Sequence, residues 1–418
     1  MTCPKCGESA RFVDYRSKDI TSLVGEMRLS RPYYHCKHCH TGIWPWDAVL
    51  CLSDESLTRG AEEVVAMLGT LDSFGTVAES VLPKAAGLSL SESTVERATE
   101  NAGKRLGAWL EAGEVFGPQK PFDWNCDAEG KTCAYVSLDA TGILMQGPNG
   151  AKADGRMVEV GMIFDPQPRT PNAPPGVPAD PQKGAKKDAK KDAKKEAKDD
   201  EDICRPCDGV RYLAGHYTLE ELGQQLRRQG AHVGMDSAEV HIALTDAGQG
   251  FERFIDVNFP RAVKIVDFRH ASEYVNDFAK AYRPGKDGDG LATTWCHMLK
   301  HEGGLAFLKV LQSLEASSIG EAAQASFGAA LSYFRNHSGR MDYPTYLKKG
   351  WQIGTGGVES ACKNVVNHRL NKGGMRWGEE GSDAVSHLRG LFCSSHDQWS
   401  AFWAHKPRPK TVNAFSAA

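Results

Sequence analysis

Apolar residues recur at two different spacings, and the change of spacing divides the chain into regions. Between residues 53 and 112 they follow the period of an α-helix, as Val64, Leu68 and Leu71 do. Several runs after residue 133 instead alternate over a few positions and end beside an acid and small residues, which is typical of strands followed by turns. The pattern therefore predicts a helical region followed by a mixed α/β region.

Three of the strand-like runs carry an aspartate near their end. CAYVSLDATG, EVHIALTDAGQG and AVKIVDFRH contain Asp139, Asp246 and Asp267, respectively. The predicted order is three strands (133–142, 143–146 and 158–164), a helix (218–229), a strand, a short helix, a strand, and then helices up to the one that holds Glu359. Acids at the carboxyl ends of strands face the crevice in which α/β folds bind ligands. This order favours an α/β fold with an RNase H-like mixed sheet and a helical insertion before its last helix.

Two CxxC pairs stand at the N-terminus, separated by a segment (10–34) of strand-like alternation. Four thiolates at this spacing close a tetrahedral zinc site, and the metal can fold a small ribbon that has almost no core. We therefore predict a zinc ribbon with Zn²⁺ bound by four residues: Cys3, Cys6, Cys36 and Cys39. A third pair, Cys204 and Cys207, has no second pair near it in sequence, and no metal is assigned to it.

The helical region contains one segment typical of DNA readers. LSLSEST (88–94) lies between two predicted helices and resembles the turn and the opening of a helix-turn-helix recognition helix. Asp54, Ser73 and Ser91 are the expected helix caps. A plain bundle of short helices is the alternative interpretation.

The stretch GTGGVESACKNVVNHRLNKGGMRW (354–377) combines one acid with many cations. A double-glycine turn leads into a helical pattern that places Glu359 in the first turn and Lys363 one turn later on the same face. Residues 340–377 contain seven Lys or Arg and only two acids, so the surface suits a polyanion. A carboxylate placed where phosphate must approach is best explained as a metal ligand. The predicted DNA-binding residues are Lys363, Arg369, Lys372 and Arg376.

Composition places the protein among ordinary soluble proteins. No run approaches the roughly 18 apolar residues of a membrane span, and MTCPKCGES is no secretory signal, so a cytoplasmic location is expected. The net charge is only −3, which means that affinity for nucleic acid must come from local patches. We predict five regions: a zinc ribbon (1–50), a helical DNA-binding region (53–115), the first part of the core (130–290) with a Pro- and Lys/Asp-rich insertion (165–205), a helical insertion (291–340) and the last part of the core (341–405).

Asp139, Asp246 and Glu359 would converge in such a core. Three adjacent carboxylates repel one another unless metal ions neutralise them, and a pair of Mg²⁺ (or Mn²⁺) ions is the expected solution. Two such ions activate a water or a 3′-hydroxyl and stabilise the leaving oxygen of a phosphodiester. The competing interpretation is that each aspartate only forms a turn at the end of its strand.

With these motifs the chain resembles bacterial insertion-sequence transposases of the DDE type, in particular the Kra group. The resemblance rests on the zinc-ribbon start, SLDATG, FPRAVKIVDFRHASEYV and GWQIGTGGVESACKNVVNHRLNKGGMRW, and it extends to near Trp403. It implies that Asp139, Asp246 and Glu359 are the catalytic triad and that Asp267 is a supporting residue. After Asp246 this chain has Ala-Gly-Gln-Gly-Phe, where the family tends to have Gly and an aromatic residue.

The resemblance implies a metal-dependent enzyme that cleaves and joins DNA in the bacterial nucleoid. Its partners would be double-stranded DNA, namely the terminal inverted repeats of the element and the target, with a homo-oligomer assembled on the DNA and no membrane. Two alternatives remain at this point: a DNA-binding protein without catalysis, and an RNase H-like nuclease that does not transfer strands.

Overall fold

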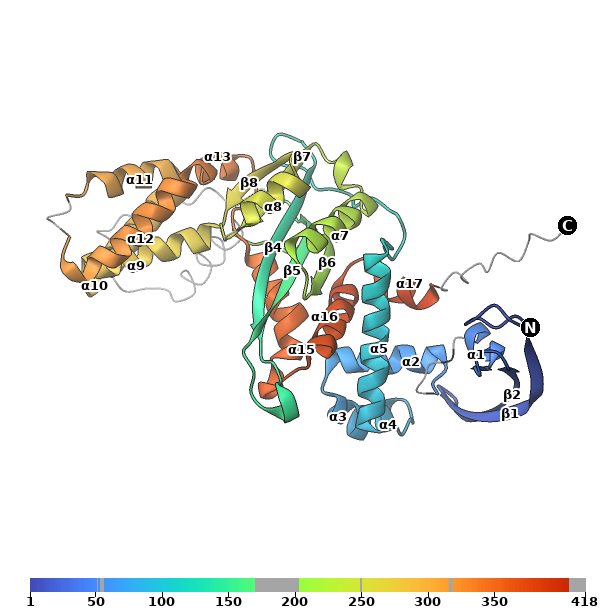
Figure 1. Ribbon diagram of the computed structural model, residues 1–418. Helices are drawn as coiled ribbons and strands as arrows, with labels where there is room; N and C mark the ends of the chain where they lie inside the picture. Colours follow the sequence, from blue (N-terminus) through green and yellow to red (C-terminus); the bar gives the residue numbers. More distant parts are fainter. Residues whose placement is uncertain (51, 53–55, 170–202, 249, 316–318, 406–418) are drawn as a thin grey trace.

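The computed structural model describes residues 1–418 apart from 51, 53–55, 170–202, 249, 316–318 and 406–418 (Figure 1). Its largest sheet has five strands in the order β6-β5-β4-β7-β8. β4 pairs antiparallel with β5 and β5 with β6, whereas β7 runs parallel to β4 and β8 parallel to β7. The strands are β4 (Cys133–Ile143), β5 (Arg156–Pro166), β6 (Cys207–Gly215), β7 (Val240–Thr245) and β8 (Ala262–Val266). A mixed sheet with many helices confirms the predicted α/β class.

The first three strands differ from the prediction. Ile143 still belongs to β4 and pairs with Arg156, so the separate strand expected at 143–146 does not exist. Gly142 did not end the strand because its backbone remains paired with Met157. The third strand is β6, which follows the insertion and was not predicted as a strand. Residues 170–202, most of that insertion, lie outside the described residues, so its predicted character stays a prediction.

Helices cover both faces of the five-stranded sheet. Val160 and Met162 of β5 belong to one core cluster, with the helices that follow β8, while Ile163 belongs to the other. On the first face α14 (Gly356–Ala361) packs against β4 and β5, and the same core cluster continues beyond the sheet into α9 (Phe268–Tyr282), α10 (Lys286–Glu302), α11 (Gly304–Ser313), α12 (Glu321–His337) and α13 (Tyr343–Lys348). The second face is covered by α5 (Glu92–Glu111), α7 (Leu219–His232), α8 (Phe251–Asn258), α16 (Glu379–Cys393) and α17 (Gln398–Ala404). Figure 1 shows α9–α12 extending to one side of the sheet as a separate group of helices.

The stretch 291–337 was predicted to be helical, and its described residues form most of α10 and all of α11 and α12, which pack around aromatic rings. Trp295 of α10 stacks on Phe278 of α9 with ring centroids 5.5 Å apart, and Phe307 of α11 contacts Phe334 of α12 at 4.8 Å. All four rings are buried. Burial of large aromatic side chains accounts for the stability of this group of helices beyond the sheet.

The helical region that precedes the five-stranded sheet in the chain packs against α16 near the C-terminus. It consists of α2 (Arg59–Leu71), α3 (Phe74–Thr76), the π-helical turn η1 (Val77–Val81), α4 (Leu82–Ala85) and α5. Ser73 and Ser91 cap helices as predicted, but α2 is capped by Thr58; Asp54 lies outside the described residues. Arg389 of α16 donates to the carbonyl of Thr70 at 3.3 Å, and this bond joins the region to the rest of the protein.

The N-terminal residues form a separate three-stranded sheet with very little core. β1 (Ala10–Ser22) and β2 (Gly25–Cys36) make a long antiparallel hairpin, and β3 (Gly42–Ile43) pairs with the end of β2. The helix α1 (Pro45–Val49) follows. Only Cys3, Ala10, Cys36 and Ile43 form its buried cluster in the described part of the chain. Such a small core needs additional stabilisation.

Across the described ranges, no helix combines the length and the apolar character required to cross a lipid bilayer.

Candidate active site

The parallel pairing of β4 with β7 brings two of the predicted acids side by side. Ser137 of β4 is in register with Leu244 of β7. Asp139 and Asp246 each follow this pair by two residues. Asp139 is still inside β4, whereas Asp246 is in the loop just after β7. Both carboxylates line one pocket of about 180 Å³.

The third predicted acid reaches the same pocket from α14. Glu359 lies in the first turn of this helix, as predicted, and its Oε1 accepts a hydrogen bond from the hydroxyl of Thr355 at 3.1 Å. Leu138 and Val358 supply apolar walls of the pocket, and His270 and Glu273 of α9 complete its polar lining. The structure therefore brings together Asp139, Asp246 and Glu359 from three distant parts of the sequence.

Asp267 also lines the pocket, but unlike the three predicted catalytic acids it is bonded mainly to backbone N–H groups. It is 1% exposed and caps α9 by accepting hydrogen bonds from the backbone N–H groups of Arg269 and His270, both at 3.1 Å. Its Oδ1 also accepts the backbone N–H of Thr355 at 3.0 Å. Because three amides already occupy its oxygens, Asp267 is a poor metal ligand. Its contacts fix the start of α14, and so the position of Glu359, relative to β8.

The pocket disfavours additional negative charge. Burial raises the pKa of Asp139, and the neighbouring carboxylates of Asp246 and Asp267 raise it further. Burial likewise raises the pKa of Glu359, with further contributions from Asp267 and Asp139. The thiol of Cys362 donates to Oδ2 of Asp139 at 3.5 Å, and burial together with this carboxylate raises the pKa of that thiol. A cation in the pocket would relieve this mutual repulsion.

The N-terminal cysteines are the other place where a metal ion fits. The Sγ atoms of Cys3 and Cys39 are 3.5 Å apart, and those of Cys6 and Cys36 are 3.6 Å apart. Four sulfurs bound to one zinc at about 2.3 Å in a tetrahedron would be separated by about 3.8 Å. Among the described residues, only these four bring three or more ligand atoms within 4.8 Å of one another. The predicted cluster can therefore hold a structural metal such as zinc.

The four predicted DNA-binding residues have different environments. Lys363 is exposed, in the π-helical turn η6 (Cys362–Asn367) that continues α14. Lys372 is exposed but pairs with Asp72 at 3.0 Å, and Arg376 is half-buried. No described contact shows whether these three bind DNA.

For Arg369 the prediction is wrong, because this residue is only 1% exposed. Its guanidinium lies between the rings of Phe74 and Trp377, 4.7 and 4.8 Å from their centroids, and its Nε donates to the carbonyl of Gly69 at 2.8 Å. Arg369 therefore joins the helical region to the C-terminal segment. Trp377 is also buried and donates to the carbonyl of Leu370, so it is a core residue.

One residue near the carboxylates was not predicted. Tyr333 of α12 stacks on Tyr274 with centroids 4.0 Å apart and is 7% exposed. Its hydroxyl is buried and has no hydrogen-bond partner among the described residues. Burial raises its pKa, with Tyr274, Asp267 and Asp246 acting in the same direction, and its ring centroid is 5.9 Å from that of His270, which lines the pocket. Nothing in the sequence singled out this tyrosine, because SYFRNH is typical of an ordinary helix.

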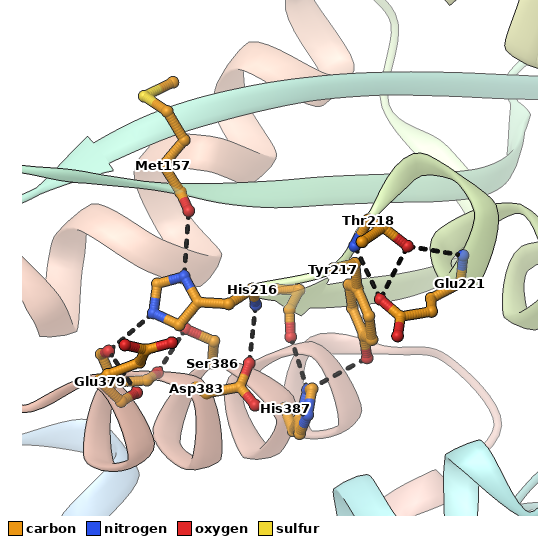
Figure 2. Close-up of polar contacts among 11 residues, drawn as sticks. Met157, His216, Tyr217, Thr218, Glu221, Glu379, Asp383, Ser386 and His387 are labelled. Carbon is orange, nitrogen blue, oxygen red and sulfur yellow. Dashed lines mark hydrogen bonds and ion pairs between the residues drawn. The ribbon is translucent and has the colours of Figure 1, made fainter.

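A second polar cluster joins α16 to the end of β6 (Figure 2). Oδ1 of Asp383 accepts the backbone N–H of His216 at 2.7 Å, and its Oδ2 is 3.3 Å from Nε2 of His387. Nδ1 of His387 is 3.0 Å from the carbonyl of Ala214 and 3.1 Å from the hydroxyl of Tyr217. The imidazole is thus held at both nitrogens. This cluster is on the face of the sheet opposite Asp139, and its contacts are structural.

Compared with known proteins, the chain matches no protein-family model and no curated protein sequence.

Proposed function

We propose that the protein is a DNA transposase of the DDE type, which binds the ends of an insertion sequence and catalyses metal-dependent cleavage and strand transfer. One observation carries the proposal: Asp139, Asp246 and Glu359 line one pocket, while the nearby Asp267 is occupied by backbone amides. Turn formation alone does not explain why three acids from distant segments converge on the same pocket.

The sheet topology supports an RNase H-like core. β4 is the central strand, β5 and β6 continue from it as an antiparallel meander, and β7 and β8 extend the sheet in parallel on its other side. Glu359 comes from a helix that packs on this sheet, and α10–α12 form the expected helical insertion before it.

The residues present fit a pair of Mg²⁺ or Mn²⁺ ions held by Asp139, Asp246 and Glu359. Their oxygens suit hard divalent cations, and burial together with the neighbouring carboxylates raises the pKa of Asp139 and of Glu359, an effect that a bound cation would offset. When bound, such ions activate the attacking oxygen and stabilise the leaving oxygen of a phosphodiester.

The protein's own groups hold the reacting parts in place. Asp267 and Thr355 fix the helix that carries Glu359, and the apolar residues Leu138 and Val358 restrict water around the carboxylates. The unpartnered hydroxyl of Tyr333 is available to hydrogen-bond a phosphate oxygen or a water close to Asp246. Proton uptake by Asp139 or Glu359 would remove a ligand charge, so metal binding should weaken in acid.

The other parts of the chain would bind DNA. The N-terminal hairpin with its four cysteines is proposed to be a zinc ribbon, and the exposed start of α5 (Glu92, Ser93) to be the opening of a DNA-reading helix. Lys363 would contact a phosphate beside the pocket. Binding two element ends and a target together would require a homo-oligomer on the DNA in the bacterial nucleoid.

The test is an assay of purified protein on labelled DNA from both flanks of its coding sequence, with Mg²⁺ or with EDTA. We expect Mg²⁺-dependent cleavage at the element ends and joining of the 3′ ends to a target plasmid. Specific binding of the ends without any cleavage would instead favour the DNA-binding alternative. Cleavage without joined products would favour a nuclease.

A further inference from the structure

A buried cation lies on the face of the central sheet opposite the candidate active site. Arg211 of β6 pairs with Ile163 of β5 and is 0% exposed. Its Nη1 donates to the carbonyl of Phe116 at 3.1 Å. Its Nε and Nη2 are also buried, and neither has a hydrogen-bond partner among the described residues. Two nitrogen atoms of a fully buried guanidinium therefore have no hydrogen-bond acceptor among the described residues.

This arrangement is costly without a counter-charge. Burial lowers the pKa of Arg211 to about 10, and no acidic group acts against that effect. Buried charges in proteins are normally paired, and buried donors normally have partners. The buried Arg369 packs instead between two aromatic rings and donates to a backbone carbonyl, although its Nη2 likewise has no hydrogen-bond partner among the described residues. Arg211 thus needs a partner that the described residues do not supply.

Two histidines that are affected by the charge of this guanidinium also have a buried nitrogen without a described hydrogen-bond partner. His232 ends α7, and His396 is in the loop between α16 and α17. The Nδ1 atom of each ring is buried without a hydrogen-bond partner in the described part of the chain. The positive charge of Arg211 lowers the pKa of both histidines in addition to the effect of burial. All three side chains can donate hydrogen bonds, and within the described ranges no carboxylate bonds to their unpartnered nitrogens.

The backbone at Gly117 brings Arg211 close to His396. A Cβ atom on Gly117 would lie 3.0 Å from the carbonyl oxygen of His396 and 3.5 Å from both terminal nitrogens of Arg211. Phe122 links the two histidines, because its N–H donates to the carbonyl of Val233 at 3.0 Å and its ring contacts the ring of His396 at 5.0 Å. The charged neighbours of His396 are Lys120 and Asp123, and both are exposed.

We propose that Arg211, His232 and His396 form a binding site for a small oxyanion such as inorganic phosphate or sulfate. The oxygens of such an anion would accept hydrogen bonds from Nε and Nη2 of Arg211 and from Nδ1 of both imidazoles. Because β6, α7 and the loop after α16 each contribute one residue, the anion would join these three elements. The site is independent of the proposed DNA chemistry.

The test uses the full-length, zinc-loaded protein without DNA. Inorganic phosphate and sulfate are titrated by calorimetry, and the melting temperature is followed at constant ionic strength while chloride is exchanged for either anion. We expect a single site, and a melting temperature that rises with the logarithm of anion concentration, since a ligand that binds only the folded state stabilises it. His396→Asn and His232→Asn should each weaken binding at least tenfold, and Arg211→Met should abolish it.

The exposed His368 supplies the control, because His368→Asn should bind the anion as the wild type does. If Arg211→Met does not fold, the two histidine variants, whose side chains are only half-buried, decide the question. The proposal is overturned if the wild type responds to phosphate and sulfate no more than to chloride, which would mean that water fills the site. Undiminished anion affinity in both histidine variants would overturn it as well.

Discussion

Oδ1 of Asp267 accepts the backbone N–H of Thr355 at 3.0 Å, and this bond connects the end of β8 to the start of the helix that holds Glu359. Because the oxygens of Asp267 accept three backbone N–H groups, this residue affects the site by holding the neighbouring backbone in position. Asp139 and Asp246 each accept one backbone N–H, from Ala140 and Gly248, and Glu359 accepts only the hydroxyl of Thr355 among the described hydrogen bonds. This contrast separates two kinds of acid at one site.

The first prediction compares these acids. Asp139→Asn, Asp246→Asn and Glu359→Gln should each abolish Mg²⁺-dependent cleavage, because each removes charge from the metal-binding set, and a loss of several kcal/mol of transition-state stabilisation lowers the rate by orders of magnitude. Thermal melting of the Asp139 and Glu359 variants should be unchanged or higher, since their carboxylates repel their neighbours. End binding, measured by gel shift, should persist.

Asp267→Asn is the matched control. Its amide keeps one oxygen, but the NH2 group would face at least one of the three backbone donors, so the protein should lose about 1–3 kcal/mol of stability in urea denaturation. Cleavage should fall less than in the other three variants. If Asp246→Asn still cleaves DNA and Asp267→Asn does not, the assignment of Asp246 as the second catalytic acid is wrong.

The second prediction separates two basic residues that look alike in the sequence. Lys363→Ala should weaken DNA binding and reduce the salt dependence of log K by about one unit, because an exposed cation contacts phosphate. Arg369→Ala should instead destabilise the fold by about 2–3 kcal/mol, since its guanidinium packs between Phe74 and Trp377. Binding isotherms in a salt series and urea denaturation measure the two effects. Equal salt slopes for wild type and Lys363→Ala would exclude a phosphate contact there.

Features that depend on a local sequence pattern could be predicted from the sequence. Features that depend on contacts between distant residues could not. The cysteine spacing, the cap at Ser91 and the first-turn position of Glu359 are all properties of short segments, and the structure contains them. The aspartates at strand ends could be expected to meet because parallel strands share one edge. Charge alone did not reveal that Arg369 is buried, because the ring of Phe74 comes from a part of the chain almost 300 residues earlier.

The strand β6 was missed for a similar reason. CDGVRYLAG follows a long charged insertion, and its alternation is short. Its place in the sheet depends on β5, which pairs with it across that insertion from Glu159–Gly215 to Pro166–Cys207. Tyr333 could not be found either, because its importance comes from an unpartnered hydroxyl, which is a property of packing.

The third prediction concerns the metal of the N-terminal cluster. One zinc per chain should be found by metal analysis, and Cys36→Ser should lose it, because closed sites with four cysteines rarely fold without metal. Since the buried core of this part is so small, chelation should unfold the β1–β2 hairpin while leaving the five-stranded sheet folded. Proteolysis and hydrogen exchange would localise the change. The isolated Cys296 gives a control, because Cys296→Ser should keep the zinc.

The fourth prediction concerns Tyr333. Removing an unpartnered buried hydroxyl relieves a desolvation cost, so Tyr333→Phe should leave the free energy of unfolding unchanged or raise it. The same variant should slow cleavage if the hydroxyl binds a phosphate oxygen or a water near Asp246. Tyr343→Phe is the comparison, because the hydroxyl of Tyr343 donates to the carbonyl of Val266 at 2.9 Å and its loss should destabilise the protein. If Tyr333→Phe cleaves DNA at the wild-type rate, the Tyr333 hydroxyl has no role in cleavage.

The last prediction follows from the pair formed by Asp383 and His387, shown in Figure 2. Although burial opposes the charged imidazole, the contact with Asp383 outweighs it and raises the pKa of His387 above the ordinary 6.5. The same pair lowers the pKa of Asp383 from 3.8 to about 2. The raised histidine contributes stability that is fully present below pH 6.5 and is lost as pH rises through its folded value. The lowered acid contributes stability that is present above pH 3.8 and is lost as pH falls towards 2.

Urea denaturation should therefore show that the wild type loses stability relative to His387→Gln as the pH rises from about 5.5 to 8.5. The difference between the two proteins isolates this pair, because the buried histidines with lowered pKa values are the same in both. His216 has a pKa that burial lowers, so His216→Gln should change the pH dependence in the opposite direction. A wild type and a His387→Gln variant with parallel stability curves over this pH range would show that His387 is neutral in the folded protein.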